Sequence, residues 1–398
     1  MKKIIFIVID GMADNPVKLF GGKTTLEAAR TPNLDLMAKN GLCGSLEPFM
    51  FDEQEAPTSE DTHIALFGFD PKRYSQGRGI FEALGAGIPL KSRDVALRIN
   101  FATVDSNLTV KDRRAGRIEN TQTLINDLNR IKIKGVKIFV KKAWGHRAVL
   151  RLRSDKDISP EVTSNDPREI SKQPLKFKAK NKTRSAIFTA QVLNEFILKS
   201  HEILKNNFIN QERKKLGLPP ANFLLLRGAG RFKKLPSFKK VWGLKACCIA
   251  GGNLYKGIAK FLGMELIKVK GANGGIDTNL KEKILTAKKC LKKNDFIFLH
   301  IKAADCLAED GNCAGKKSFI EKIDRHLKPL LDLKNSYIII TCDHKTACEK
   351  KMHAKGNVPF LIYGDGNNGI ESFSEDSCKK LVMPARSFIK FILDLQKK

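Results

Sequence analysis

Acidic and imidazole side chains stand next to four strongly apolar segments of the chain. These side chains are Asp10, Asp305, Asp343, His344 and His353, beside the segments Ile4–Ile9, Phe296–Ile301, Tyr337–Thr341 and Val358–Tyr363. Any one of them alone is more simply explained as a helix cap or a hydrogen-bonded core histidine. Together they form the donor set of carboxylate oxygens and imidazole nitrogens that divalent cations bind. Two ions in such a cluster polarise a phosphoryl group and lower the pKa of an attacking hydroxyl.

A hydroxyl group suited to that attack belongs to Ser59, in the segment 57–63 (PTSEDTH), which precedes the helical run Ile64–Phe67. A serine in this position can present its Oγ and nearby backbone N–H groups to a phosphate at a helix N-terminus. The alternative is that Ser59 only caps the helix, with help from Thr62 or Asp61. The spacing alone does not separate a nucleophile from a cap.

The elements that must position these groups alternate along the chain between strands and helices. This pattern predicts an α/β fold with a mainly parallel sheet, in which ligands bind beyond the carboxyl ends of the strands. One helix is expected to begin with Thr31 as N-cap and Pro32 and to end at Gly41, and another to run from Asn253 to Gly263. The predicted strands are Ile4–Ile9, Phe223–Leu226, Ala246–Ala250, Glu265–Val269, Phe296–Ile301, Tyr337–Thr341 and Val358–Tyr363.

The middle of the chain has a different character. It contains the predicted strands Val95–Val104 and Ala148–Arg153, two long helical patterns and a basic loop at 172–182. A chain of 398 residues is also long enough for two domains. We therefore predict a second, α+β domain at 93–243, inserted into a first domain made of 1–92 and 244–398.

The chain is strongly basic, with 72 Lys and Arg against 42 Asp and Glu and a net charge of +30. Such a charge attracts polyanions. The lysines are spread almost evenly, as in 281–293, and are not interleaved with the aromatic residues on which single-stranded nucleic acids stack. The favoured interpretation is a solvated, lysine-biased surface without a nucleic-acid partner, and contact with RNA or another polyanion is the alternative.

The cysteines and the lengths of the apolar runs indicate the cellular compartment of the protein. Nine cysteines are scattered without a Cys-x-x-Cys pair, which favours reduced thiols over disulfides or a zinc ribbon. No apolar run approaches the roughly 20 residues that span a bilayer. The run Ile4–Ile9 stops at Asp10 and is too short for an export signal. We expect a cytoplasmic protein with no membrane partner, and the oligomeric state stays open.

Ten short motifs occur in a specific order over nearly the whole chain. They are 8–11 (VIDG), 23–29 (KTTLEAA), 31–35 (TPNLD), 77–79 (GRG), 100–105 (NFATVD), 112–118 (DRRAGRI), 145–148 (GHRA), 226–230 (LRGAG), 254–257 (LYKG) and 274–279 (GGIDTN). In this combination the chain resembles the archaeal-type 2,3-bisphosphoglycerate-independent phosphoglycerate mutases of the alkaline-phosphatase-like superfamily. The resemblance implies a phosphatase-type domain that holds two divalent metal ions, with an inserted domain that grips the substrate.

The resemblance also implies an isomerase of glycolysis that interconverts 3-phosphoglycerate and 2-phosphoglycerate through a phosphoserine on Ser59, without bisphosphoglycerate. Mn²⁺ or Mg²⁺ is the expected ion, and Zn²⁺ and Co²⁺ are also compatible. His63 and Lys302 are implied as further catalytic residues. Residue by residue, one ion would be held by Asp10, Ser59, Asp343 and His344, and the other by Asp305, Glu309 and His353. The implied substrate-binding residues are Arg78, Arg98, Arg113, Arg114, Arg117 and Arg227.

Two positions depart from the family pattern. Glu309 stands where the family has a histidine, and the segment 59–63 reads SEDTH where the family usually has SDTAH. A glutamate oxygen favours Mn²⁺ or Mg²⁺ over Zn²⁺, and its charge opposes an incoming phosphate. The alternatives to the mutase are therefore a phosphomonoesterase, a mutase of another phosphorylated substrate, or a non-catalytic relative that binds polyanions.

Overall fold

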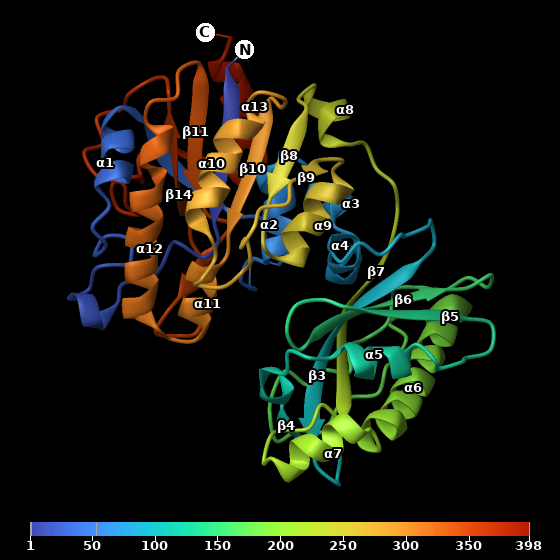
Figure 1. The fold of residues 1–398 in the computed structure, drawn as a ribbon. Helices are drawn as coiled ribbons and strands as arrows, with labels where there is room; N and C mark the ends of the chain where they lie inside the picture. The colour runs from blue at the N-terminus through green and yellow to red at the C-terminus, as the bar shows by residue number, and fades with distance from the viewer. Residues whose placement is uncertain (1, 53, 398) are drawn as a thin grey trace. The chain divides into compact units, whose positions relative to one another are not determined.

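The computed structural model describes residues 2–52 and 54–397, and the chain divides into two compact units (Figure 1). Unit 1 consists of Met1–Ser75 and Leu235–Lys398, and unit 2 of Gln76–Lys234. The predicted boundaries, at 92/93 and 243/244, differ from these. Unit 2 begins earlier because helix α4 (Arg78–Gly85) packs tightly on strand β3 (Val95–Val104). A Cβ atom on Gly79 would lie 2.2 Å from the carbonyl oxygen of Ala96, so only glycine allows this approach.

Unit 1 is built on an 8-stranded sheet in the order β15-β2-β14-β11-β1-β10-β8-β9. Only β14 runs antiparallel to its neighbours, and the other pairings are parallel. The prediction of an α/β fold with a mainly parallel sheet is therefore confirmed. The strands are β1 (Lys3–Ile9), β2 (Gly41–Glu47), β8 (Ala246–Ile249), β9 (Glu265–Leu266), β10 (Phe296–Ile301), β11 (Ser336–Thr341), β14 (Val358–Tyr363) and β15 (Val382–Pro384).

Helices cover both faces of this sheet. Figure 1 shows α1 (Pro32–Lys39), α10 (Leu280–Cys290) and α12 (Cys313–Leu327) in front of it. On the other face, the ring of Phe6 lies 6.0 Å from that of Phe67 and 5.9 Å from that of Phe388. Phe67 directly follows α2, and Phe388 is the first residue of α13. Further helices of unit 1 are α2 (Ser59–Leu66), α3 (Pro71–Tyr74), α8 (Phe238–Trp242), α9 (Asn253–Phe261), α11 (Ala303–Glu309) and α13 (Phe388–Leu395).

Most predicted elements of unit 1 form, but one predicted strand is shorter, and several strands were not predicted, among them β12 (Lys345–Ala347), β13 (Met352–Ala354) and β15. The strand predicted at Glu265–Val269 has only the two residues of β9. Strand β2 was not predicted, and it begins at Gly41, where a helix was expected to end. Its glycines hide it, since glycine is depleted in strands. A Cβ atom on Gly44 would lie 2.6 Å from the ring of Phe360, so the close packing of β2 on β14 requires glycine there.

Unit 2 contains a 5-stranded antiparallel sheet in the order β4-β3-β6-β5, with β7 also paired to β3. The apolar side chains of β3 and β6 pack with those of helices α5 and α6 in one buried cluster. The sheet and helices together give the predicted α+β architecture. Its other elements are β4 (Val110–Asp112), β5 (Lys137–Lys142), β6 (Arg147–Arg153), β7 (Phe223–Arg231), α5 (Gln122–Leu128), α6 (Arg184–Lys205) and α7 (Phe208–Lys215).

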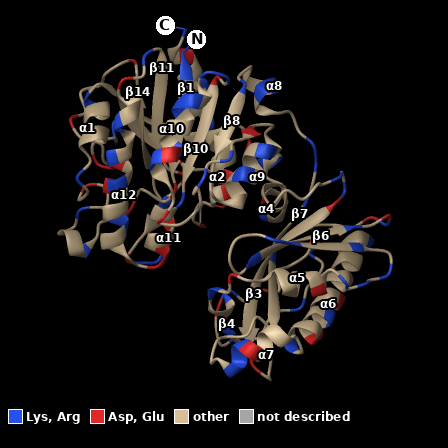
Figure 2. Ribbon diagram, in the orientation of Figure 1, with Lys and Arg blue, Asp and Glu red and all other residues tan. Residues whose placement is uncertain are grey.

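The surface agrees with a lysine-biased composition. Figure 2 shows Lys and Arg along the helices and loops of each unit, with Asp and Glu among them. All nine cysteines are free thiols, as predicted. Among residues 2–52 and 54–397, we find no helix that combines the length and the apolar character needed to cross a membrane.

Candidate active site

The chemistry-bearing side chains of unit 1 lie at one edge of its sheet. Strands β10, β1 and β11 are adjacent and parallel, so their carboxyl ends meet at the same edge. Asp10 directly follows β1, Asp305 lies in α11 after β10, and Asp343 and His344 follow β11. His353 comes from β13 (Met352–Ala354), which pairs with β12 (Lys345–Ala347). All five residues lie close together, and only His353 is partly exposed.

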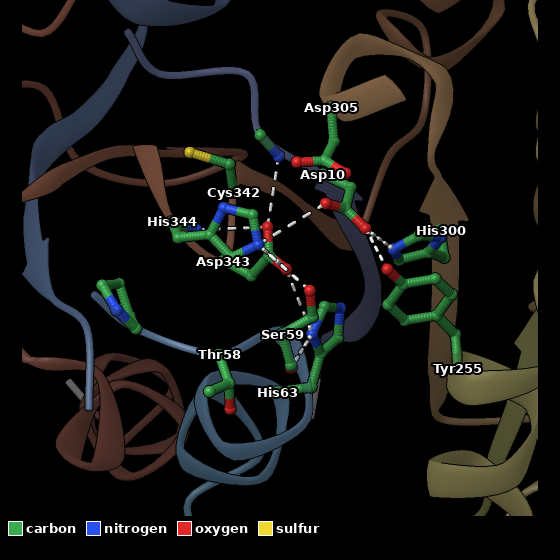
Figure 3. A network of polar contacts seen from close by, with 12 residues as sticks. Asp10, Thr58, Ser59, His63, Tyr255, His300, Asp305, Cys342, Asp343 and His344 are labelled. Atoms are coloured by element: carbon green, nitrogen blue, oxygen red, sulfur yellow. Dashed lines mark hydrogen bonds and ion pairs between the residues drawn. The ribbon is translucent and has the colours of Figure 1, made fainter. Parts of the chain in front are cut away.

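A first group consists of Asp10, Asp343 and His344, whose ligand atoms all lie within 4.8 Å of one another. His344 Nε2 is 3.1 Å from Asp343 Oδ2 and 3.8 Å from Asp10 Oδ1 (Figure 3). The backbone N–H of Gly11 donates to Asp343 Oδ1 over 3.2 Å. Gly11 has a φ of +62°, and a Cβ there would lie 2.6 Å from the hydroxyl of Thr346. The chain can therefore pass this closely to the group only as glycine.

A second group consists of Asp305, His344 and His353, again with ligand atoms within 4.8 Å of one another. Thr346 donates from its hydroxyl to Asp305 Oδ1 over 2.7 Å, and its Oγ1 is 3.1 Å from His344 Nδ1. The rings of His344 and His353 stack with centroids 3.7 Å apart. His344 thus belongs to both groups, whereas the sequence assigned it to the first alone, and the bridging role of Thr346 was not predicted.

Ser59 points into the first group rather than capping its own helix. It is the first residue of α2, and the N-cap is Thr58, whose Oγ1 accepts a hydrogen bond from the N–H of Asp61 over 3.3 Å. The capping alternative for Ser59 is therefore wrong. Its Oγ lies 3.0 Å from His344 Nε2, and the side chain is buried (Figure 3). The hydroxyl is thus available for chemistry beside an imidazole and two carboxylates.

His63 and Lys302, the two other predicted catalytic residues, also lie in this cluster. His63 Nδ1 donates to the carbonyl of Ser59 over 2.7 Å, and burial lowers the pKa of its ring. Lys302 Nζ is 3.1 Å from Asp10 Oδ2 and 2.5 Å from Asp305 Oδ2. Burial alone would lower the pKa of Lys302, but the two carboxylates raise it well above its ordinary value. A charged ammonium group therefore connects a carboxylate of each group.

Besides Thr346, two further residues that contact the site were not predicted from the sequence. Tyr255 and His300 both contact Asp10 Oδ2, and both are buried. The available signals were the motif at 254–257, which contains Tyr255, and a single histidine inside the otherwise apolar strand Phe296–Ile301.

Glu309 is the predicted ligand that the structure does not bring to either group. It is the last residue of α11 and is exposed, whereas Asp305, one turn earlier on the same helix, is buried. Asp305 and Glu309 are four residues apart and share one side of the helix, but Glu309 stands at the helix end, next to the exposed Asp310.

Replacing Glu309 by glutamine is therefore expected to weaken Mn²⁺ binding by less than about fivefold, since exposed charges contribute about 1 kcal/mol or less. Isothermal titration calorimetry measures this directly. Asp305→Asn serves as the matched control and should weaken binding by at least about tenfold, the lower end of the loss seen even for outer partners of a metal. An equal loss in Glu309→Gln would restore glutamate to the ligand set.

The residues present fit divalent metal ions. Oδ1 of Asp10 and Oδ2 of Asp343 are buried and accept no well-aligned hydrogen bond. Such atoms require a partner, and a cation is the partner that suits a carboxylate oxygen. Burial alone would raise the pKa of Asp343, but His344 outweighs it and lowers this pKa, so the carboxylate is ionised. The same carboxylate raises the pKa of His344 to about 9 against the effect of burial.

Unit 2 holds a separate cluster of arginines around β3. Arg98 lies on β3 and is buried, and burial together with Arg78, Arg147 and Arg227 holds its pKa well below the ordinary value. Burial and Arg78 also lower the pKa of Arg227 to about 10. Burial is the largest cause of both shifts, and the repulsion that adds to it shows that these four guanidinium groups lie near one another.

The remaining predicted arginines belong to the same neighbourhood. Burial, together with Arg147, Arg98, Arg114 and Arg117, lowers the pKa of His146 to about 3. Arg113 is paired with Asp166 at 2.8 Å, and the same carboxylate is 3.8 Å from Arg227. All the arginines predicted to bind substrate are therefore brought together. Arg147 and His146 were not predicted, although the motif at 145–148 contains both.

Comparisons with known proteins agree with one another. A family model described as 2,3-bisphosphoglycerate-independent phosphoglycerate mutase matches residues 38–210. A mutase of this description from Archaeoglobus fulgidus is 42% identical, covering 94% of this chain and 92% of its own. One from Methanococcus aeolicus is 40% identical, covering 99% and 98%.

Two solved structures resemble the chain over its full length. A Pyrococcus horikoshii protein has a TM-score of 0.85 at 30% identity, covering 100% of this chain and 97% of its own. A cofactor-independent phosphoglycerate mutase from Thermoplasma acidophilum has a TM-score of 0.68 at 32% identity, covering 99% and 100%.

Proposed function

The chain belongs to the 2,3-bisphosphoglycerate-independent phosphoglycerate mutase family, and from this premise we propose how its residues divide the reaction. The enzyme is an isomerase that interconverts 3-phosphoglycerate and 2-phosphoglycerate. One observation carries the proposal: Ser59 Oγ lies 3.0 Å from His344 Nε2, inside a buried cluster of three aspartates.

Asp10, Asp343 and His344 would hold one divalent ion, and Asp305 and His353, next to the shared His344, would hold the second. Ions bound there supply positive charge that stabilises the phosphoryl oxygens and lowers the pKa of the serine hydroxyl. The first ligand set has two carboxylates and one imidazole, and the second has one carboxylate and two imidazoles. Carboxylate oxygens suit Mn²⁺ or Mg²⁺, and imidazole nitrogens also suit Zn²⁺. We propose Mn²⁺ or Mg²⁺ as the working ions.

Ser59 is the residue that exchanges the phosphoryl group. Its Oγ forms a bond to the phosphorus of 3-phosphoglycerate while the bond from phosphorus to the substrate O3 breaks, and the hydroxyl proton passes to the departing oxygen. In the second transfer the 2-hydroxyl oxygen of glycerate bonds to phosphorus, the bond from phosphorus to Ser59 Oγ breaks, and the proton of that hydroxyl returns to Oγ. Phosphoryl transfer demands positioning and charge rather than covalent help from many residues. His63 holds the backbone of Ser59, and Lys302 supplies fixed positive charge between Asp10 and Asp305.

The arginines of unit 2 are proposed to bind the carboxylate and phosphate oxygens of the substrate. Guanidinium groups bind such anions through paired N–H donors. Buried and mutually repelling, Arg98 and Arg227 gain most from an anion, because it replaces repulsion by attraction. A mutase must retain glycerate and exclude water between the two transfers. Tight anion binding by this cluster serves that need.

The experiment that tests the proposed function is an enolase-coupled assay with 3-phosphoglycerate, Mn²⁺ and no bisphosphoglycerate. We expect steady formation of 2-phosphoglycerate. Release of inorganic phosphate without isomer would instead assign the chain as a phosphomonoesterase.

Removal of divalent ions should abolish the activity and lower the stability of the protein. After dialysis against EDTA we expect no detectable mutase activity, with recovery on addition of Mn²⁺. Free Mn²⁺ at about 100 times its Kd should stabilise the folded state by about 2.7 kcal/mol, because the ion binds only that state. Differential scanning calorimetry measures the rise in unfolding temperature. Full activity in EDTA would refute a role for bound ions.

A further inference from the structure

The two carboxylate oxygens of Asp10 have very different surroundings. Oδ2 accepts a short hydrogen bond from the hydroxyl of Tyr255, and it lies 3.1 Å from His300 Nε2 and 3.1 Å from Lys302 Nζ. Oδ1 accepts no hydrogen bond, although it is buried, and lies 3.8 Å from His344 Nε2. Figure 3 shows Tyr255 and His300 on one side of Asp10, with His344 and Asp343 on the other.

Two of the three side chains that contact Oδ2, those of Tyr255 and His300, are themselves firmly held. The rings of Tyr255, on α9, and His300, on β10, stack with centroids 3.4 Å apart. His300 stands opposite Val8 in the pairing of β10 with β1. Its carbonyl accepts a hydrogen bond of 2.9 Å from the buried ammonium group of Lys283. Neither ring can move without disturbing the sheet or the other ring.

A carboxylate attached by a single Cβ–Cγ bond rotates unless its oxygens are bound. The hydroxyl of Tyr255 and the ring nitrogen of His300, together with the ammonium group of Lys302, hold one oxygen and so fix which oxygen faces Asp343 and His344. Outer partners of this kind orient a ligand and strengthen its ion.

We propose that Tyr255 and His300 are positioning residues, which hold Asp10 through Oδ2 so that Oδ1 is presented as the ligand atom beside His344. This inference rests on the proposed function, since it assumes that an ion binds the first group. A merely structural role for the pair, in which the two stacked rings only fill the space beside Asp10, predicts no effect on ion binding.

The test is the Mn²⁺ affinity of Tyr255→Phe, measured by isothermal titration calorimetry on the full chain. The phenylalanine keeps the stacked ring and removes only the donor. We expect Mn²⁺ to bind the weakened site about 10- to 100-fold less tightly. Activity should return toward the wild-type value at excess Mn²⁺, with an unchanged KM for 3-phosphoglycerate. A structural role alone would not produce this rescue.

Tyr337→Phe is the matched control, because Tyr337 is also buried in unit 1 but its hydroxyl contacts Asp365 instead, at 3.3 Å. It should bind Mn²⁺ like the wild type. His300→Gln and His300→Leu give a second comparison: glutamine retains a donor and should bind more tightly than leucine.

Wild-type affinity in Tyr255→Phe and equal affinities in the two His300 variants would overturn the inference. The proposed function fails separately, if the unaltered protein binds no Mn²⁺ or works in EDTA. Unfolding curves recorded in EDTA show whether each variant is folded, and a Tyr255→Phe protein that does not fold leaves the decision to the His300 pair.

Discussion

Replacing Ser59 by alanine is expected to lower kcat of the mutase reaction by about 10⁴-fold or more, the scale of loss seen when a nucleophile is removed. The hydroxyl lies 3.0 Å from His344 Nε2, and alanine keeps the helix intact because Thr58 provides the cap. The variant should still bind Mn²⁺ and 3-phosphoglycerate. Its loss should appear in kcat in the enolase-coupled assay, with little change in the unfolding temperature.

Thr58→Ala is the control for this experiment, and it should show the reverse pattern. Removing a threonine N-cap costs about 1 kcal/mol of stability, while Ser59 retains its hydroxyl and most of the activity should remain. If Ser59→Ala retained wild-type activity, another group would have to carry the phosphoryl transfer.

Replacing Arg98 by methionine is expected to change activity and stability in opposite directions. Arg98 is 4% exposed, its Nε has no hydrogen-bond partner, and Arg78, Arg147 and Arg227 repel its charge. Methionine occupies a similar volume without the charge. Replacing buried charges with apolar side chains can raise the free energy of unfolding by about 1–4 kcal/mol.

The same change should cost about 2–5 kcal/mol of substrate binding, the loss typical of a buried charged partner. Urea unfolding and the value of kcat/KM measure the two effects. Arg151→Met on the neighbouring strand β6 is the matched control, since Arg151 lies over the ring of Phe139 outside this cluster, 5.1 Å from its centroid. It should bring neither a gain in stability nor a loss of activity. A destabilised and fully active Arg98→Met would refute an anion-binding role.

The sequence predicted those strands whose signal is local. Strands β3, β10 and β14 form at the predicted residues, because short segments rich in apolar and β-branched side chains specify strands. Strand β2 was missed, because Gly41 and Gly44 are disfavoured in strands by local propensity. They are needed there for close packing against the neighbouring strand β14. The start of unit 2 was predicted too late for a similar reason. Gly79 permits the close contact of α4 with β3, and this contact is not visible in the local sequence.

The candidate site divides in the same way. Acids and imidazoles that follow strands were predicted to converge because parallel strands end at a common edge. Tyr255, His300 and Thr346 act through contacts with residues distant in sequence, which no spacing rule reveals. The exposure of Glu309 at the end of α11 does not follow from its spacing to Asp305, since residues four apart share one side of a helix. Arg147 and His146 belong to the unit 2 cluster only through the pairing of β6 with β3.

We propose above all that Ser59 carries the phosphoryl group between the two hydroxyls of glycerate. The most direct measurement is mass spectrometry of peptides from the enzyme, acid-quenched during turnover of 3-phosphoglycerate with Mn²⁺ and without bisphosphoglycerate. We expect a phosphoserine at Ser59 that disappears when substrate is exhausted and is absent from Ser59→Ala. Phosphate on a different residue, or turnover with no phosphorylated enzyme at any time, would contradict it.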